Sequence, residues 1–119
     1  METKQITLTI EHRGGVASTS FSGRPEGEKV RKVFSLDEKD VDDCNYIIDI
    51  PSGTSAFNPS FYLGFLFPSI KKLGVEKFLS KYKFSFANLS PTLKSLIEDD
   101  LREGLRNASN ELNFSTGLD

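Results

Sequence analysis

The sequence has few of the side chains that build covalent cross-links and metal centres. Its 119 residues contain a single cysteine, Cys44, and a single histidine, His12. One thiol cannot form an internal disulfide, and the two side chains together cannot supply the four Cys/His ligands of a structural zinc site. We therefore expect a chain that folds without a disulfide, a metal or another cofactor, as its length permits.

Long apolar runs and an excess of charge of either sign are also lacking. The longest apolar stretch, residues 61–67, is far shorter than the roughly 18 residues of a membrane span. The formal net charge is −2, and no basic start leads into an apolar run. These observations predict no signal peptide, no membrane contact and no nucleic-acid partner, and they favour a cytoplasmic location.

Three segments have the patterns of strands. Residues 4–11 and 82–88 alternate apolar with polar side chains, which predicts strands with one buried face. Residues 45–50 form a short and almost continuous apolar run, which predicts a central strand covered on both faces. The segment 12–27 is rich in glycine and hydroxyl residues and reads as a loop, with room for a fourth short strand at 16–21.

Two helices are predicted from start signals and apolar spacing. Over residues 25–35, Val30, Val33 and Phe34 form a stripe on one helix face. The acidic segment 36–44 either continues that helix or forms a surface turn. A second helix begins with Asn58 as N-cap and Pro59 in the first turn, and it ends at Gly74.

The second and third helices carry further signals. Pro68 lies inside the second helix, which must kink there or divide into two. Ser90 and Pro91 open a third helix with an apolar stripe formed by Leu93, Leu96, Ile97, Leu101 and Leu105. We expect one domain over residues 1–107, followed by a polar and frayed tail over 108–119.

The order of these segments predicts the fold class. Strands that alternate with helices indicate an α/β domain, here with a mixed or parallel sheet of about four strands and about three helices. Ligands and partners of such sheets bind at the carboxyl ends of the strands, near helix N-termini. The connection over residues 51–57, between the central strand and the second helix, lies at such a place.

Two motifs resemble a known family. The segment IIDIPSGTSAFNPSFYLGFLF (47–67) is similar to the signature of STAS domains, named for sulphate transporters and anti-sigma factor antagonists. The similarity is closer to bacterial STAS-like domains of unknown function, where a strand ending in Asp precedes a Ser-Phe pair that opens an apolar helix. The segment SGRPEGEKVRK (22–32) resembles that group's Gly/Arg loop and Gly-Glu-x-x-Arg helix, through Arg24, Gly27, Glu28 and Arg31. The resemblance covers about residues 4–107.

The resemblance implies a STAS-like domain without known catalytic activity that docks to partner proteins. In some STAS domains a kinase phosphorylates a serine at the start of the helix after the central strand. Here Asp49 matches the strand-end aspartate and Ser60 falls at that serine position. Members of the group resemble components encoded near sensor-kinase-like ATPases, so such an ATPase is the partner that the resemblance suggests. The motif departs from the family at Asn58, Pro59 and Phe61, where STAS domains carry Asp, Ser and Gly.

Ser60 is compatible with three roles. Its hydroxyl could simply face water in the first helical turn, accept a phosphate that the helix dipole stabilises, or contact a partner unmodified. The surface expected to bind the partner consists of Ser52, Thr54, Ser55, Asn58, Ser60 and Tyr62.

Two alternative functions remain open from the sequence. Arg24 and Arg31, with the helix N-termini at Asn58 and Ser90, could bind a phosphate or nucleotide. The structural interpretation is that the two arginines instead contact Asp49, Glu28 or loop carbonyls. A structural oligomerisation module is the third possibility, and the sequence does not determine the oligomeric state. His12 is expected to have no catalytic role, and Cys44 is expected to be a buried thiol.

Overall fold

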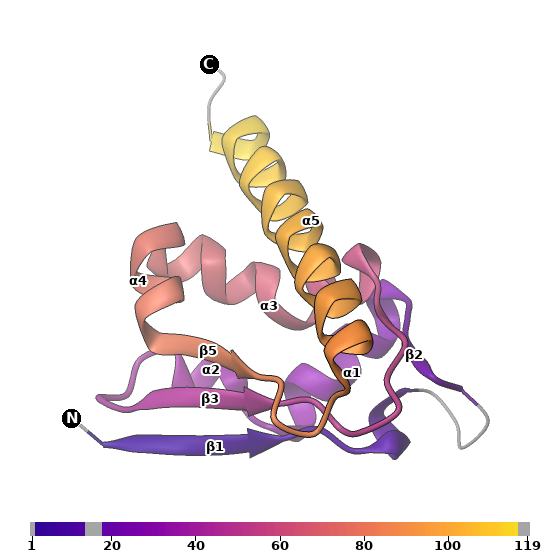
Figure 1. Cartoon of the computed structure of the whole chain (residues 1–119). Helices are drawn as coiled ribbons and strands as arrows, with labels where there is room; N and C mark the ends of the chain where they lie inside the picture. Colours follow the sequence, from indigo (N-terminus) through magenta and orange to yellow (C-terminus); the bar gives the residue numbers. More distant parts are fainter. Residues whose placement is uncertain (1, 14–17, 117–119) are drawn as a thin grey trace.

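The computed structural model describes residues 2–13 and 18–116 (Figure 1). Strands β1 (Thr3–Thr7), β3 (Asn45–Asp49) and β5 (Tyr82–Ser85) form a parallel sheet in the order β1-β3-β5. Strands β2 (Ser20–Phe21) and β4 (Ala56–Phe57) form a second, two-residue parallel pair. The α/β class is confirmed, but the expected single sheet of about four strands is instead one three-stranded sheet and one short pair.

Five α-helices and one 3-10 helix complete the described part of the chain. They are η1 (Ile10–Arg13), α1 (Arg24–Val33), α2 (Leu36–Lys39), α3 (Pro59–Leu73), α4 (Val75–Lys81) and α5 (Pro91–Thr116). The short strand expected at 16–21 is present as β2, and residues 16 and 17 lie outside the described part. The acidic segment after α1 forms the separate helix α2, because Ser35 takes a left-handed conformation with φ of 52°.

The predicted helix starts and stops are confirmed at several positions. Asn58 and Ser90 precede α3 and α5, and the Oγ of Ser90 accepts a hydrogen bond from the backbone N–H of Leu93. Helix α3 runs through Pro68 without a division there. It ends at Gly74, whose φ of 83° suits glycine, and α4 follows directly.

Within the described part of the chain, helices cover one face of the three-stranded sheet and leave Ile47 on the other face exposed. Ile6, Tyr46 and Ile48 are buried, as the alternation predicts for one face. The opposite face carries Gln5 and Ile47 in register with Lys83, and Ile47 is 36% exposed. The prediction that β3 is covered on both faces was therefore wrong.

Two other expected apolar positions are also exposed. Ile10 is 42% exposed, because β1 ends at Thr7 and the chain turns into η1 before reaching it. Val33 is 60% exposed, because α1 turns Gly27, Val30 and Arg31 toward the interior instead of the predicted stripe. Val30 alone of the three stripe residues is fully buried, and Phe34 is half-buried.

Helices α1 and α3 cross with their backbones almost in contact. A Cβ atom added at Gly27 would lie 2.3 Å from the carbonyl oxygen of Phe61, and one added at Gly64 would lie 2.1 Å from that of Arg24. Any side chain at either position would push the helices apart. The crossing holds the N-terminal halves of the two helices together, next to the β2–β4 pair.

Helix α5 is longer than predicted and projects beyond the rest of the molecule at its C-terminal end (Figure 1). Ala108 is fully buried, and the carboxylate of Glu111 pairs with the guanidinium of Arg24 at 3.0 Å. The tail expected over residues 108–119 is helical as far as Thr116, and residues 117–119 lie outside the described part. Leu96, expected in the apolar stripe, is 48% exposed. Within residues 2–13 and 18–116, no helix combines the length and apolar character needed to cross a membrane.

Candidate functional site

The β2–β4 pair brings two polar segments of the chain side by side. Ser20 lies opposite Ala56 and Phe21 opposite Phe57, so residues 18–23 run along residues 55–60. The rings of Phe21, Phe57 and Phe61 pack with centroids 5.1–5.3 Å apart beneath this pair. The small strands thus have an aromatic anchor on one side and polar side chains on the other.

These polar side chains form what we call the hydroxyl surface, defined as Thr19, Ser20, Ser22, Ser55, Asn58 and Ser60. Hydrogen bonds join its two segments. The Oγ1 of Thr19 lies 2.7 Å from the Oγ of Ser55, and the Nδ2 of Asn58 donates to the Oγ of Ser22 at 2.8 Å. All six side chains are exposed or half-buried. The surface is thus both accessible and held in one arrangement.

Ser60 lies where the N-termini of two helices meet. It is exposed in the first turn of α3, and its Oγ accepts a hydrogen bond from the backbone N–H of Gly23, the N-cap residue of α1, at 3.2 Å. Both helix ends carry partial positive charge from their unpaired N–H groups. The hydroxyl of Ser60 therefore bridges two helix starts, a role that the sequence did not indicate.

Asn58 is the N-cap of α3 in position but not in its side-chain bonding. Its side chain makes no capping hydrogen bond, and its amide reaches across to Ser22. Its backbone N–H donates to the carbonyl of Phe21 at 2.9 Å. Asn58 thus ties the start of α3 to the segment before α1 and helps to hold the two segments of the hydroxyl surface together.

Two residues expected on the partner surface are buried. Thr54 is fully buried, and its hydroxyl donates to the carbonyl of Pro51 at 2.8 Å. Tyr62 is 2% exposed and lies against Gly104 of α5, and this burial raises the pKa of its phenol. Neither side chain can contact a partner in this conformation, so both assignments are corrected. Ser52 is exposed, as expected, in the connection between β3 and β4.

Sequence reasoning missed the half of the hydroxyl surface that comes from residues 18–23. The run Ser18-Thr19-Ser20-Phe21-Ser22 held the signal, because one aromatic residue among four hydroxyl residues is typical of a short strand with one buried side chain. Its pairing with residues 55–60 could not be found from spacing, because the two segments lie more than 30 residues apart.

Arg31 lies in a buried ionic network, not in an anion site. Its guanidinium donates to Asp40 at 2.8 Å and Asp37 at 2.6 Å, and also to the Ser69 hydroxyl and the Phe65 carbonyl. The other oxygen of Asp40 accepts from the hydroxyls of Ser69 and Tyr82, each at 2.6 Å. Burial and the hydrogen bond to Asp40 raise the pKa of Tyr82, so this phenol stays protonated as a donor.

Arg24 is also paired within the protein. Both of its terminal nitrogens donate to Glu111, at 3.0 and 3.3 Å, and its guanidinium lies 5.8 Å from the centre of the Phe67 ring. The structural interpretation of the two arginines is therefore favoured, but with different carboxylate partners. Asp49 is instead a nearly buried acceptor for the Asn88 amide at 3.1 Å, and Glu28 is exposed.

A second buried cation, Lys81, lies beside Cys44, whose thiol was expected to be buried. Lys81 is 9% exposed, and its ammonium donates to the carbonyls of Asp42 and Cys44 and to the Asp42 carboxylate. Burial opposes ionisation of the Asp42 carboxyl. Hydrogen bonds from Lys81 and Tyr46 outweigh this effect and lower the pKa of Asp42 to about 2. Cys44 itself is half-buried and not fully buried as expected.

His12 has a local structural role. Its Nδ1 accepts the backbone N–H of Thr9 at 3.0 Å, and its ring packs edge-on against Phe34 with centroids 5.1 Å apart. Burial lowers the pKa of His12 and outweighs the opposing effect of Glu11. The ring is therefore neutral at pH 7, as an acceptor at Nδ1 requires.

Comparison of the chain with protein-family models, with curated proteins and with solved structures finds no match. The STAS-like resemblance therefore stays a prediction from the motifs. The functional interpretation depends on the geometry of the hydroxyl surface and on the chemistry of its side chains.

Proposed function

We propose that this protein is a non-enzymatic cytoplasmic regulatory domain that binds a partner protein through the hydroxyl surface. The observation that carries the proposal is the convergence of two distant segments into one exposed and hydrogen-bonded polar surface at the junction of two helix starts. Ordered polar side chains on a rigid base lose little conformational entropy on binding, which favours recognition. The aromatic cluster of Phe21, Phe57 and Phe61 supplies that base.

Ser60 is the proposed switch of this surface. A phosphate on its Oγ would carry a charge of about −2 and would lie beside the N–H groups of two helices, which stabilise anions. The same modification would change the neutral hydroxyl surface into an acidic one. Partner affinity would then depend on the phosphorylation state, and the sensor-kinase-like ATPase suggested by the resemblance is the proposed kinase and partner.

The test measures binding and phosphorylation separately. The purified protein is titrated with a candidate ATPase by calorimetry, and Ser60→Arg and Asn58→Arg are each expected to weaken binding at least about tenfold. Ser80→Arg, at an exposed position of α4, is the matched control and is expected to bind normally. Incubation with ATP followed by mass spectrometry should locate a phosphate at Ser60 and none in Ser60→Ala.

Two results would count against the proposal. Affinity unchanged by both arginine substitutions would remove the hydroxyl surface as the binding site. Affinity unchanged by Ser60→Asp, together with no phosphate at Ser60, would remove the switch while leaving the binding surface intact.

A further inference from the structure

Arg13 is buried without the partners that a guanidinium normally requires. It closes η1 and is 8% exposed. Its Nη1 donates to the Oγ1 of Thr54 at 3.0 Å, which is its one hydrogen bond to the described residues, and its buried Nε has no acceptor among them. No carboxylate of the described residues forms an ion pair with it.

The other two buried cations of the described residues, Arg31 and Lys81, each donate to several acceptors, including at least one carboxylate. Arg31 donates to two carboxylates, a hydroxyl and a carbonyl, and Lys81 uses three acceptors. An unpaired buried charge is strongly unfavourable, whereas a paired and hydrogen-bonded one is tolerated. Among the described residues Arg13 is therefore the exception, a buried guanidinium with a hydroxyl partner and no carboxylate.

The unused side of the Arg13 guanidinium has a defined chemistry. Thr54 occupies Nη1, the buried Nε has no acceptor, and no described residue is hydrogen-bonded to Nη2 on the same edge. This edge presents two parallel N–H groups, which bind both oxygens of a carboxylate or two oxygens of a phosphate. Thr54 also donates to Pro51, and this second bond fixes the hydroxyl that orients the guanidinium.

The position of Arg13 in the fold is also typical of ligand sites. Helix η1 follows the carboxyl end of β1, and Thr54 follows the carboxyl end of the neighbouring strand β3. The backbone N–H of Leu8 donates to the carbonyl of Asp49 at 3.0 Å, so the two strand ends stay together. Parallel sheets bind ligands outside these ends.

We propose that Arg13, oriented by Thr54, binds a small oxyanion, namely a phosphate or carboxylate group, at the carboxyl edge of the three-stranded sheet. The site differs from the anion site expected at Arg24 and Arg31, because those two arginines are already paired with carboxylates. It is also independent of the proposed switch at Ser60.

The test is a titration with inorganic phosphate, with sodium acetate as the carboxylate probe, both at constant ionic strength set by chloride. The melting temperature of the wild type should rise by several degrees and saturate with one of the two anions. In Arg13→Met this rise should vanish, while Arg24→Met, which also removes one positive charge, should keep it. Arg13→Lys keeps the positive charge but lacks the two parallel N–H groups of the guanidinium, so binding should weaken about tenfold.

A direct readout covers the case in which Arg13→Met does not fold. The Nε–Hε resonance of Arg13 in the wild-type protein should shift in NMR spectra as the anion is added, with the same midpoint as the thermal titration. The absence of both a saturable melting shift and a resonance shift with either anion would overturn the proposal. A melting shift that persists in Arg13→Met, or that disappears in Arg24→Met, would overturn it equally.

Discussion

Gly27 and Gly64 set the distance between the two helices that support the hydroxyl surface. Each has the backbone of the other helix in the place where a Cβ atom would lie. We expect Gly27→Ala to lower the free energy of unfolding by about 1–3 kcal/mol, the usual effect of overpacking. Urea denaturation measures this, with Lys32→Ala on the exposed face of α1 as the control. An equally stable Gly27→Ala variant would mean that the helices do not approach this closely.

The buried network around Asp40 leads to a second prediction at the residue scale. Asp40 accepts from Arg31, Ser69 and Tyr82 and has no exposed side-chain surface. Replacing it with alanine leaves the Arg31 charge underneutralised, so we expect a loss of about 3–5 kcal/mol in unfolding free energy. Denaturation of Asp99→Ala, which breaks the exposed pair with Arg102, should show a loss below about 1 kcal/mol. Similar losses in both variants would contradict the network.

Asp42 leads to a prediction about pH. Its pKa falls from 3.8 to about 2 on folding, so the unfolded chain binds this proton more readily than the folded one. The resulting stabilisation is therefore present above pH 3.8 and is lost as the pH falls toward 2. NMR titration of the Asp42 carboxyl carbon should give a midpoint near 2. In Asp42→Asn, the unfolding free energy should lose part of its pH dependence between pH 2 and pH 3.8. A wild-type titration midpoint near 3.8 would contradict the prediction.

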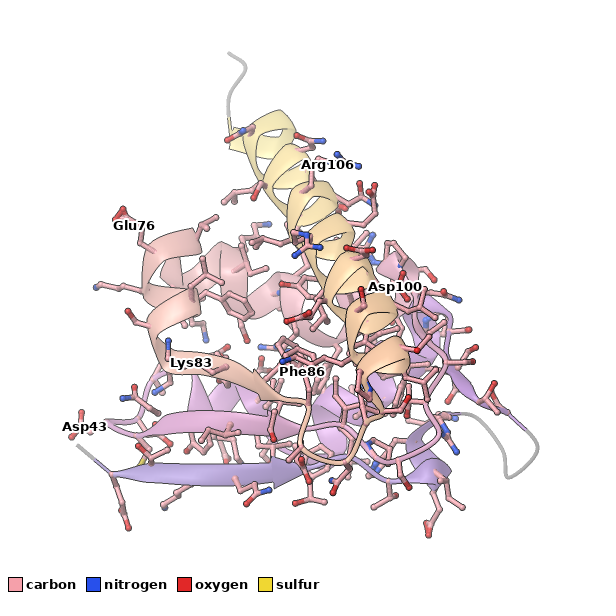
Figure 2. The ribbon with its side chains drawn as sticks, in the orientation of Figure 1. Asp43, Glu76, Lys83, Phe86, Asp100 and Arg106 are labelled. Carbon is pink, nitrogen blue, oxygen red and sulfur yellow. The ribbon has the colours of Figure 1, made fainter. Side chains whose placement is uncertain are left out.

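At the scale of elements, α5 links parts of the molecule that are distant in sequence. The carboxylate of Asp100 (Figure 2) accepts the backbone N–H of Phe57 at 2.9 Å, which holds β4 against the helix. Glu111 pairs with Arg24 at the start of α1, eleven residues further along the same helix. Through these two contacts, helix α5 supports both segments of the hydroxyl surface.

The C-terminal part of α5 should therefore be protected from hydrogen exchange. Ala108 is fully buried and Glu111 is paired, so we expect the amide of Ala108 to exchange far more slowly than an unstructured amide. Glu111→Ala should speed exchange in this turn while leaving the amide of Ile97, near the start of α5, unchanged. Fast exchange at Ala108 in the wild type would support the frayed tail that composition suggested.

At the scale of the whole molecule, the distribution of exposed apolar residues bears on oligomerisation. The large ones among the described residues come from six different parts of the chain, namely Ile10, Val33, Val41, Ile47, Leu79 and Leu96. Single apolar side chains are normal on a monomer, whereas a contiguous patch marks an interface. Of the six, Leu79 borders an apolar groove that is also lined by Phe84, Phe86 and Leu101. We expect light scattering to give a monomer mass independent of concentration. A mass that rises with concentration would favour the oligomerisation module instead.

Local signals predicted those features that depend on neighbouring residues alone. The alternation in residues 4–8, the caps at Asn58 and Ser90 and the stop at Gly74 are each decided within one or two turns of backbone. The length of α5 was not predicted, because the residues after Asn107 are mostly polar. The burial of Ala108 and the ion pair of Glu111 with Arg24 depend on contacts with other elements. The candidate site was half predicted, because the pairing of residues 18–23 with residues 55–60 depends on contacts between segments that are distant in sequence.

The sequence by itself determined the α/β class, the start of α3 and the presence of hydroxyl side chains around Ser60, because these follow from local backbone preference and side-chain chemistry. Tertiary structure alone decided which segments meet. It paired β2 with β4, gave Arg24 and Arg31 their carboxylates and left Arg13 buried with one hydrogen bond to the described residues. The physical reason is that a charged side chain takes its role from the partners that packing brings within about 3 Å, and these partners are far away in sequence.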